Sequence, residues 1–234
     1  MKGKLYLIPV PLGSDGVQTI PDYVLVQIRR LRVFITERGK TARQFLKAVE
    51  TPIPLPEMEF YELNKHTDPA EVAGFLAAAE RGTDIGMLSE AGCPGVADPG
   101  AQVARLAHDR GIQVVPLVGP SSILLALMAS GLDGQSFAFN GYLSPKPGGL
   151  NRELRQLEQR ALKHQQTQIF METPYRNNKM LDVVMKTLQP QTRFCVAANL
   201  TQPDEFVRTK TIQDWWLQPP PDLHKIPAMF LIGK

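Results

Sequence analysis

Short apolar runs alternate with amphipathic stretches along the first half of the chain. The apolar runs predict strands at 5–8, 33–36, 58–63, 85–88 and 112–116. Apolar residues at helical spacing predict helices between them, at 21–30, 41–49, 69–81 and 101–110. Repeated strand–helix alternation is typical of a mostly parallel sheet with helices on its faces.

The second half of the chain has a different pattern, because several of its strands follow one another without an intervening helix. It predicts helices at 122–130, 150–163 and 176–188, and strands at 168–171, 193–198, 204–209 and 229–232. We therefore expect a mixed sheet here. The fold class is α/β with two domains, 1–117 and 118–234.

Composition and charge are those of a globular protein with a substantial core. The 234 residues are 43% hydrophobic and carry a formal net charge of +3, which permits a nucleic-acid partner without requiring one. Cys93 and Cys195 lie far apart, as expected of reduced thiols in the cytoplasm. The apolar run at 5–12 is broken by two prolines, so we expect neither a signal peptide nor a membrane partner.

The richest loop in glycine and proline follows the predicted strand at 85–88. Within 92–100 it holds three glycines and two prolines, which expose the main chain and fix its course. A second such loop, Pro9–Gly13, follows the first strand. Because open α/β sheets bind ligands at the carboxyl ends of their strands, the two loops predict one shared ligand crevice.

The sequence lacks a P-loop, a GxGxxG fingerprint, a GxSxG nucleophile motif and any metal-ligand spacing of its four histidines. Positioning an already activated donor is the chemistry that remains, and we predict no metal. Acids at predicted strand ends are candidates for a catalytic base or, alternatively, for caps and surface ion pairs: Glu37, Glu90, Asp98 and Glu172. Asp98 is predicted to cap the following helix.

Basic side chains near these loops are candidates for phosphate contacts, although a solvated positive face is the better explanation of any single one. The substrate-binding candidates are Arg38, Lys40, Arg43 and Arg176. The neighbouring Trp215 and Trp216 are predicted to anchor a core or a subunit interface.

The order of these motifs resembles the tetrapyrrole methylase superfamily, the class III S-adenosylmethionine (SAM)-dependent methyltransferases. Within it, the pattern is most similar to the branch that methylates a cytidine 2′-hydroxyl in small-subunit ribosomal RNA. The resemblance spans nearly the whole chain and is carried by the segments Pro9–Gly13, Leu88–Pro94, Ala97–Gly100, Val118–Ser122, Ser130–Leu132, Phe139–Leu143 and Glu172–Arg176.

The resemblance implies two α/β domains with SAM in the cleft between them, usually in a homodimer. It also implies direct methyl displacement without a metal, with S-adenosyl-L-homocysteine as product. Of the acids at predicted strand ends, Glu37, Glu90 and Glu172 are the catalytic candidates. The implied cofactor contacts are Pro11, Leu88, Ser89, Glu90, Ala91, Gly92, Ser121, Ser122, Tyr142, Leu143, Pro227, Ala228 and Met229.

The chain departs from the ribosomal RNA branch at positions expected to face the acceptor. Glu37-Arg38-Gly39-Lys40 replaces an acidic Glu-Asp-Thr-Arg run, Tyr175 replaces a His, and Ala198-Asn199 replaces an Arg-Glu pair. Three hypotheses therefore stand: a methyltransferase acting on ribosomal RNA or the small ribosomal subunit, one acting on a tetrapyrrole or another small molecule, and a catalytically silent SAM-binding protein.

Overall fold

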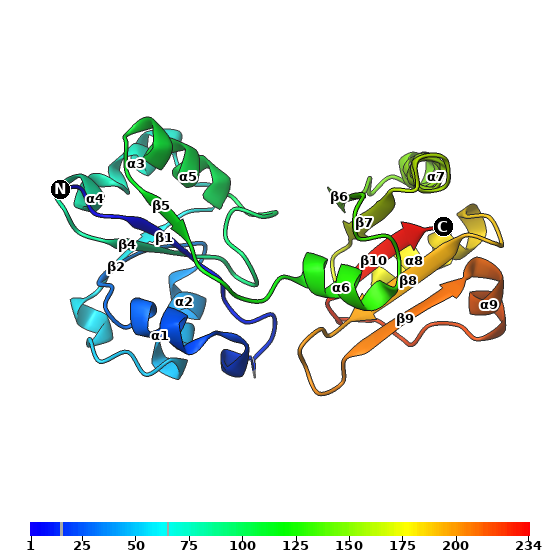
Figure 1. The fold of residues 1–234 in the computed structure, drawn as a ribbon, viewed down its shortest axis with the longest axis horizontal. Coiled ribbons are helices and arrows are strands. Elements are labelled where there is room, and N and C mark those ends of the chain that lie inside the picture. The colour runs from blue at the N-terminus through cyan, green and yellow to red at the C-terminus, as the bar shows by residue number, and fades with distance from the viewer. Residues whose placement is uncertain (15, 65) are drawn as a thin grey trace. The chain divides into compact units, whose positions relative to one another are not determined.

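The computed structural model describes residues 1–14, 16–64 and 66–234, and it divides into two compact units. Unit 1 is Met1–Ser121 and unit 2 is Ser122–Lys234, each built around its own five-stranded sheet (Figure 1). No helix within the described residues is long and apolar enough to cross a membrane.

The sheet of unit 1 is entirely parallel, as its strand–helix alternation predicts. Its strands lie in the order β3-β2-β4-β1-β5, and each neighbouring pair is parallel. The bounds are β1 Leu5–Ile8, β2 Val33–Thr36, β3 Glu59–Glu62, β4 Ile85–Leu88 and β5 Val114–Pro116.

Helices cover both faces of this sheet (Figure 1). Helices α1 (Asp22–Ile28) and α2 (Gly39–Ala48) cover one face, and α3 (Pro69–Gly74), α4 (Ala77–Glu80) and α5 (Gly100–Asp109) cover the other. Successive side chains of each strand point to opposite faces. Accordingly, Phe34 packs in the α1–α2 core, whereas Ile35 packs in the α3–α5 core. Two single turns of 3₁₀ helix, η1 (Val17–Thr19) and η2 (Leu55–Glu57), complete the connections.

The prediction of a single helix at 69–81 is wrong in one respect, because the structure has two shorter helices there, α3 and α4. The predicted apolar face is present, since Val72, Phe75, Leu76 and Ala79 are all buried. Leu76, however, has ψ near 2°, outside the helical range. Gly74, which costs about 1 kcal/mol in a helix interior, ends α3 just before this break. Apolar spacing therefore predicted the buried face but not the break in the helix.

The sheet of unit 2 is mixed, as predicted. Its order is β6-β7-β10-β8-β9, in which β6 and β7 are parallel and the other neighbours are antiparallel. The bounds are β6 Phe137–Tyr142, β7 Thr167–Met171, β8 Arg193–Ala198, β9 Phe206–Thr211 and β10 Ala228–Gly233.

Four helices complete unit 2: α6 (Ser122–Ser130), α7 (Pro147–His164), α8 (Asn177–Thr187) and α9 (Ile212–Leu217). The predicted inward face of α7 is confirmed, because Leu150, Leu154, Leu157 and Ala161 are all buried in one core with α8 and α9. Helix α9 itself was not predicted, since it has fewer than two turns and lacks a full amphipathic period.

The two tryptophans of α9 have different environments. Trp215 is 2% exposed, and its indole Nε1 donates a hydrogen bond to the Phe194 carbonyl at 2.9 Å. Trp216 is 53% exposed, and its Nε1 donates to the Met185 carbonyl at 3.1 Å. Trp215 is therefore the core anchor that the sequence predicted, and Trp216 lies on the surface.

We predict that Trp215→Ala lowers the free energy of unfolding of unit 2 by about 3–5 kcal/mol, because it empties a filled core position. Trp216→Ala should cost about 1 kcal/mol or less. Both tryptophans of the chain lie in unit 2, so the fluorescence of the remaining one in urea titrations reports on that unit. Equal losses in the two variants would contradict this assignment.

Candidate active site at the carboxyl edge of the parallel sheet

The carboxyl ends of β1 and β4 form a topological switch point in unit 1. The two strands are neighbours in the sheet, yet the connection after β1 leads to α1 and the connection after β4 leads to α5, on the opposite face. Ligands of open α/β sheets bind where neighbouring connections diverge in this way. The two loops that the sequence singled out, 9–13 and 89–100, begin at this point.

A main-chain bridge joins these two loops. Val10 donates to the Gly92 carbonyl at 3.0 Å, and Gly92 donates to the Val10 carbonyl at 3.1 Å. Gly92 has φ +71°, and a Cβ there would lie 3.3 Å from Leu12 Cδ2 and 3.5 Å from the Pro120 carbonyl oxygen. The Ser89 hydroxyl also donates to the Gly92 carbonyl, at 2.9 Å. Glycine is therefore required here by its conformation and by the close approach of other chain segments.

The loop after β5 packs against the same pair of loops. A Cβ on Gly119 would lie 2.4 Å from Pro9 Cβ, so only a glycine allows this approach. The Cys93 thiol donates to the Pro120 carbonyl at 3.5 Å. Ser121, one of the expected cofactor contacts, follows directly. Three strand-end loops of unit 1 thus form one connected surface.

Asp98 holds the far part of the 89–100 loop. Its Oδ1 accepts hydrogen bonds from the main-chain N–H groups of Gly95 and Gly100, each at 2.7 Å. The predicted N-cap position is wrong by one residue, because Pro99 occupies it, although Asp98 still accepts from Gly100, the first residue of α5. Burial raises the pKa of Asp98, and the two N–H donors oppose that rise.

A cavity of about 250 Å³ opens beside this surface, on the α2 side. One wall is the loop after β1, a second is the end of β4, and a third is α2. The lining residues are Val10, Pro11, Gly13, Ser14, Val17, Thr41, Ala42, Gln44, Phe45, Ala48, Leu88, Ser89 and Glu90. The structure thus brings together four of the expected cofactor contacts: Pro11, Leu88, Ser89 and Glu90.

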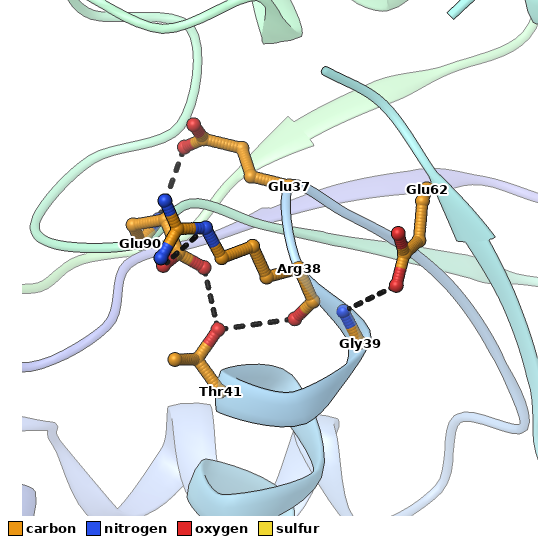
Figure 2. Close-up of polar contacts among 6 residues, drawn as sticks. All are labelled: Glu37, Arg38, Gly39, Thr41, Glu62 and Glu90. Atoms are coloured by element: carbon orange, nitrogen blue, oxygen red, sulfur yellow. Dashed lines mark hydrogen bonds and ion pairs between the residues drawn. The ribbon is translucent and has the colours of Figure 1, made fainter. Parts of the chain in front are cut away.

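Carboxylates gather around the segment from Arg38 to Thr41 (Figure 2), and one of them, Glu90, lines this cavity. Glu90 Oε1 accepts from the Thr41 hydroxyl at 2.5 Å, and Glu90 Oε2 lies 3.8 Å from Arg38 Nε. Glu37 Oε1 accepts from the main-chain N–H of Glu90 at 3.1 Å. Arg38 thus supplies a positive charge beside Glu90, and Glu37 holds the Glu90 main chain.

Burial raises the pKa of Glu37 above its usual value of 4.5. The hydrogen bond from the Glu90 N–H lowers that pKa, and the negative charges of Asp98 and Glu90 raise it further. A carboxyl group that resists ionisation in this way destabilises the folded state at neutral pH.

The three basic candidates of unit 1 differ in how far their side chains are held by neighbouring residues. The Arg38 side chain is 77% exposed, and Lys40 is also exposed. The Arg43 guanidinium lies 4.4 Å from the centroid of the Phe60 ring, and this contact orients it. The Glu62 carboxylate accepts from the Gly39 N–H at 2.8 Å, at the start of the helix that carries these side chains (Figure 2).

In unit 2, a second set of expected cofactor contacts lies across the neighbouring strands β6, β7 and β10, at the same end of the sheet. Tyr142 pairs with Met171, which in turn pairs with Met229. Leu143 follows Tyr142 directly, and Ala228 precedes Met229 at the start of β10. The Pro227 carbonyl accepts from the Asn199 N–H at 3.0 Å. Ser122, by contrast, begins α6 and lies outside these strands.

Glu172 and Arg176 form an ion pair between the end of β7 and the N-cap position of α8. The Glu172 side chain is only 5% exposed, and its other oxygen accepts from the Thr173 N–H at 2.6 Å. Both carboxylate oxygens are therefore already hydrogen-bonded. The pair borders a small cavity of about 60 Å³. This arrangement suits a residue that orients Arg176 better than one that accepts a proton.

The sequence did not single out the α2 wall of the larger cavity. Thr41, Gln44 and Phe45 follow a helical pattern, which carries no sign of a ligand site. They become lining residues only because β2 lies beside β4 and so places α2 next to the 89–100 loop. Within the described residues, no group of three or more His, Cys, Asp or Glu side chains is placed to hold a metal ion.

Comparison with known proteins places this geometry in a family. Residues 4–215 match the family model of tetrapyrrole (corrin/porphyrin) methylases. The chain is 30% identical to the ribosomal RNA small subunit methyltransferase I of Synechocystis sp., over 90% of this chain and 72% of that protein. It is also 30% identical to the protein of the same name from Bacillus subtilis, over 88% of this chain and 67% of that one.

Solved structures share the fold at lower identity. The methyltransferase CobJ aligns with a TM-score of 0.65 at 15% identity, over 99% of this chain and 94% of that one. The uroporphyrin-III C-methyltransferase of Thermus thermophilus, in complex with S-adenyl homocysteine, aligns with a TM-score of 0.58 at 16% identity, over 99% and 98%. Sequence and fold agree: the chain belongs to the tetrapyrrole (corrin/porphyrin) methylase family and is a SAM-dependent methyltransferase.

Proposed function

We propose that this methyltransferase acts on small-subunit ribosomal RNA, at the 2′-hydroxyl of a cytidine. The observation that carries the proposal is the 30% identity, along about nine-tenths of the chain, to proteins named ribosomal RNA small subunit methyltransferase I. The resemblance of the motifs to the cytidine 2′-O-methylating branch supplies the ribose as the acceptor.

We assign the cofactor to the main chain after β4. The bridge between Val10 and Gly92 fixes this segment, and the absence of a Cβ on Gly92 lets Leu12 and the Pro120 carbonyl pack against it, so the main chain of the loop is held in place. In unit 1 the proposed contacts are Pro11, Leu88, Ser89, Glu90, Ala91, Gly92 and Ser121. In unit 2 they are Ser122, Tyr142, Leu143, Pro227, Ala228 and Met229.

We assign the acceptor nucleoside to the 250 Å³ cavity. Its volume lies just below the roughly 300–1,000 Å³ typical of pockets for drug-sized ligands, which favours a single nucleoside over a tetrapyrrole macrocycle. Its walls are partly apolar, at Val17 and Phe45, and partly polar, at Thr41, Gln44 and Glu90. A base with an apolar face and polar edges suits such a lining.

Glu90 is the proposed proton acceptor, because it lines the cavity and its carboxylate is held by the Thr41 hydroxyl. Bound SAM supplies a methyl group on a sulfonium centre. The ribose oxygen forms the new O–C bond as the S–C bond breaks, and its proton passes to the Glu90 carboxylate. Glu37 positions Glu90 through the main-chain N–H. Glu172 positions Arg176, which contacts RNA.

Phosphate contacts from α2 complete the proposed site. Arg38, Lys40 and Arg43 all lie within its first two turns or directly before it, and all are exposed. Arg38 also neutralises Glu90. One side chain thus contacts both the phosphates of the acceptor RNA and the carboxylate that accepts the proton. Charged groups of this kind fix the register of an RNA strand without reading its sequence.

The proposed form is a cytoplasmic homodimer. The motif resemblance implies the dimer, and the exposed apolar side chains of Leu124 and Met128 on α6 support it, because burying them on association is favourable. Small ribosomal subunits in the same compartment would be the natural partner.

The replacement of a charged pair by Ala198 and Asn199 favours one alternative, a SAM-binding protein without activity. Ala198 is 2% exposed, and the Asn199 side chain donates to Asp204 Oδ2 at 2.7 Å. Neither residue presents a charge to a substrate. An activity assay separates this alternative from the proposed function.

We predict that the protein transfers tritiated methyl groups from SAM to undermethylated small ribosomal subunits, with the label recovered in a ribose. Naked ribosomal RNA and a tetrapyrrole, assayed in parallel, test the other acceptors. Label in the tetrapyrrole alone would overturn the RNA proposal. SAM binding without label in any acceptor would support the silent alternative.

Glu90→Gln should lower kcat in this assay by about 10²- to 10⁴-fold, since it removes the proton acceptor and keeps the main chain that contacts the cofactor. SAM affinity should be unchanged by calorimetry. Glu62→Gln is the matched control, because Glu62 caps Gly39 in the same cluster but does not line the cavity. A fall in kcat of less than threefold for Glu90→Gln would reject this role.

Gly92→Leu should abolish SAM binding, because the added side chain meets Leu12 and the Pro120 carbonyl and so displaces the loops whose main chain is proposed to contact the cofactor. Gly111→Leu is the matched control: Gly111 has a similar φ of +62° and has no other group within 4 Å of an added Cβ. Both variants should lose about 1–2 kcal/mol of stability from the left-handed conformation. Unchanged calorimetric affinity for SAM in Gly92→Leu would refute the proposed placement.

Glu37→Gln should stabilise the protein at pH 7. The folded-state pKa of Glu37 is raised, so wild-type stability falls as the pH rises from 4.5 through that folded-state value. Glutamine keeps an oxygen that accepts from the Glu90 N–H but cannot ionise. Melting temperatures should therefore rise at pH 7 and change little at pH 4. Glu37→Ala, which loses the acceptor, separates the hydrogen bond from the charge, and a gain independent of pH would contradict the assignment.

A further inference from the structure

An exposed aromatic side chain lies between β7 and α8 in unit 2. Tyr175 is 70% exposed. The His224 ring meets it nearly at a right angle, at 77°, with 6.0 Å between the ring centroids. Lys225 Nζ lies 6.0 Å from the centre of the same tyrosine ring. The tyrosine ring thus has His224 and Lys225 as neighbours, while most of the residue stays accessible.

Hydrogen bonds fix the two segments that carry these rings. The Lys225 N–H donates to the Pro174 carbonyl at 3.0 Å. The Asn178 side chain donates to Asp222 Oδ1 at 2.6 Å and accepts from the Leu223 N–H at 2.8 Å. Leu223 is 1% exposed and anchors this segment in the core. The ring environment is therefore ordered before a ligand arrives, which reduces the entropic cost of binding.

Cationic side chains lie on the two segments that carry Tyr175 and His224. Lys225 and Lys179 are exposed, and the Arg176 side chain is 42% exposed. Glu172 is buried against Arg176 and offsets its charge. Asp222 accepts from the Asn178 side chain and from the His224 N–H, and these hydrogen bonds lower its pKa, so it stays ionised and offsets one lysine. The surface therefore keeps a net positive charge.

From this arrangement we propose that the Tyr175 surface, made of Tyr175, Arg176, Lys179, His224 and Lys225, binds an unpaired segment of the acceptor RNA. A base stacks on the tyrosine ring, and the lysines contact the adjoining phosphates. Proteins recognise unpaired RNA by stacking its bases on aromatic side chains within a positive surface. This inference rests on the proposed function, since it assumes an RNA acceptor, and it adds a base-stacking residue that the methyl-transfer site does not require.

The charge argues for RNA over a protein partner or a second copy of the chain. Arg176 is paired with Glu172, and the two lysines outweigh Asp222. This net positive charge would repel the same surface of another protomer, whereas it attracts phosphates. A protein or dimer contact at this surface remains an outcome that the test identifies.

The experiment measures the binding of a mixed-sequence single-stranded RNA of about 16 nucleotides to the full chain in saturating SAM. Tyr175→Ala should weaken binding by about 5- to 150-fold, and Tyr175→Phe should restore it, because stacking needs the ring and not the hydroxyl. Trp216→Ala is the matched control, since Trp216 is an exposed aromatic residue of the same unit, and it should bind as wild type. Lys179→Gln and Lys225→Gln should each reduce the salt dependence of binding by about one unit of slope.

A change of less than twofold for Tyr175→Ala would overturn the inference, and so would wild-type protein without measurable affinity for the RNA. A Tyr175→Ala effect on oligomeric state by light scattering, with RNA affinity unchanged, would assign the surface to a second copy. The methylation assay keeps the two proposals apart. If the wild type binds RNA through Tyr175 but labels no ribose, only the proposed function fails. If it labels ribose equally well with Tyr175→Ala, only the inference fails.

Discussion

The pair of main-chain hydrogen bonds between Val10 and Gly92 is the constraint on which the site of unit 1 depends. The pair joins the loops after β1 and β4 just beyond the sheet, where strand pairing would otherwise end. Because the connections leave to opposite faces, these loops would separate without it. The bridge in turn requires a glycine with positive φ, and the loop after β5 packs against it through Pro120. One backbone contact thus sets the course of three loops.

The acidic side chains at the carboxyl ends of β2 and β4 lower the stability of the folded state. Glu37, Glu90 and Asp98 lie near one another, and burial raises the pKa of Glu37 and of Asp98. Main-chain N–H groups offset part of this cost, since each of these two carboxylates accepts at least one. A structural core would be more stable with neutral side chains here. The retained charges are consistent with a site that handles protons.

Much of the fold could be predicted from sequence, because strand burial depends on local apolar runs. Strands 5–8, 33–36 and 85–88 have the predicted bounds, and the mixed second sheet followed from adjacent strands. The break after Gly74 follows from a residue that disfavours helix, which the apolar period does not report. The short helix α9 has too few residues to show a period. The same limit applies to the site. Glycine and proline revealed the two loops, whereas the α2 wall formed by Thr41 and Phe45 exists only through strand order.

The two units have different proposed roles, methyl transfer in unit 1 and RNA binding in unit 2, and the topology of each sheet suits its role. A parallel sheet brings all its carboxyl ends to one edge, so unit 1 can gather several loops, their N–H groups and their acids around a small cavity. A mixed sheet has no such common edge, and unit 2 instead presents strand ends, a buried ion pair and the ordered ring of Tyr175. Chemistry needs converging polar groups, whereas holding an RNA strand needs exposed rings and charges. Under the proposed function, the departure from a His to Tyr175 therefore concerns how RNA is held and not the reacting groups of unit 1.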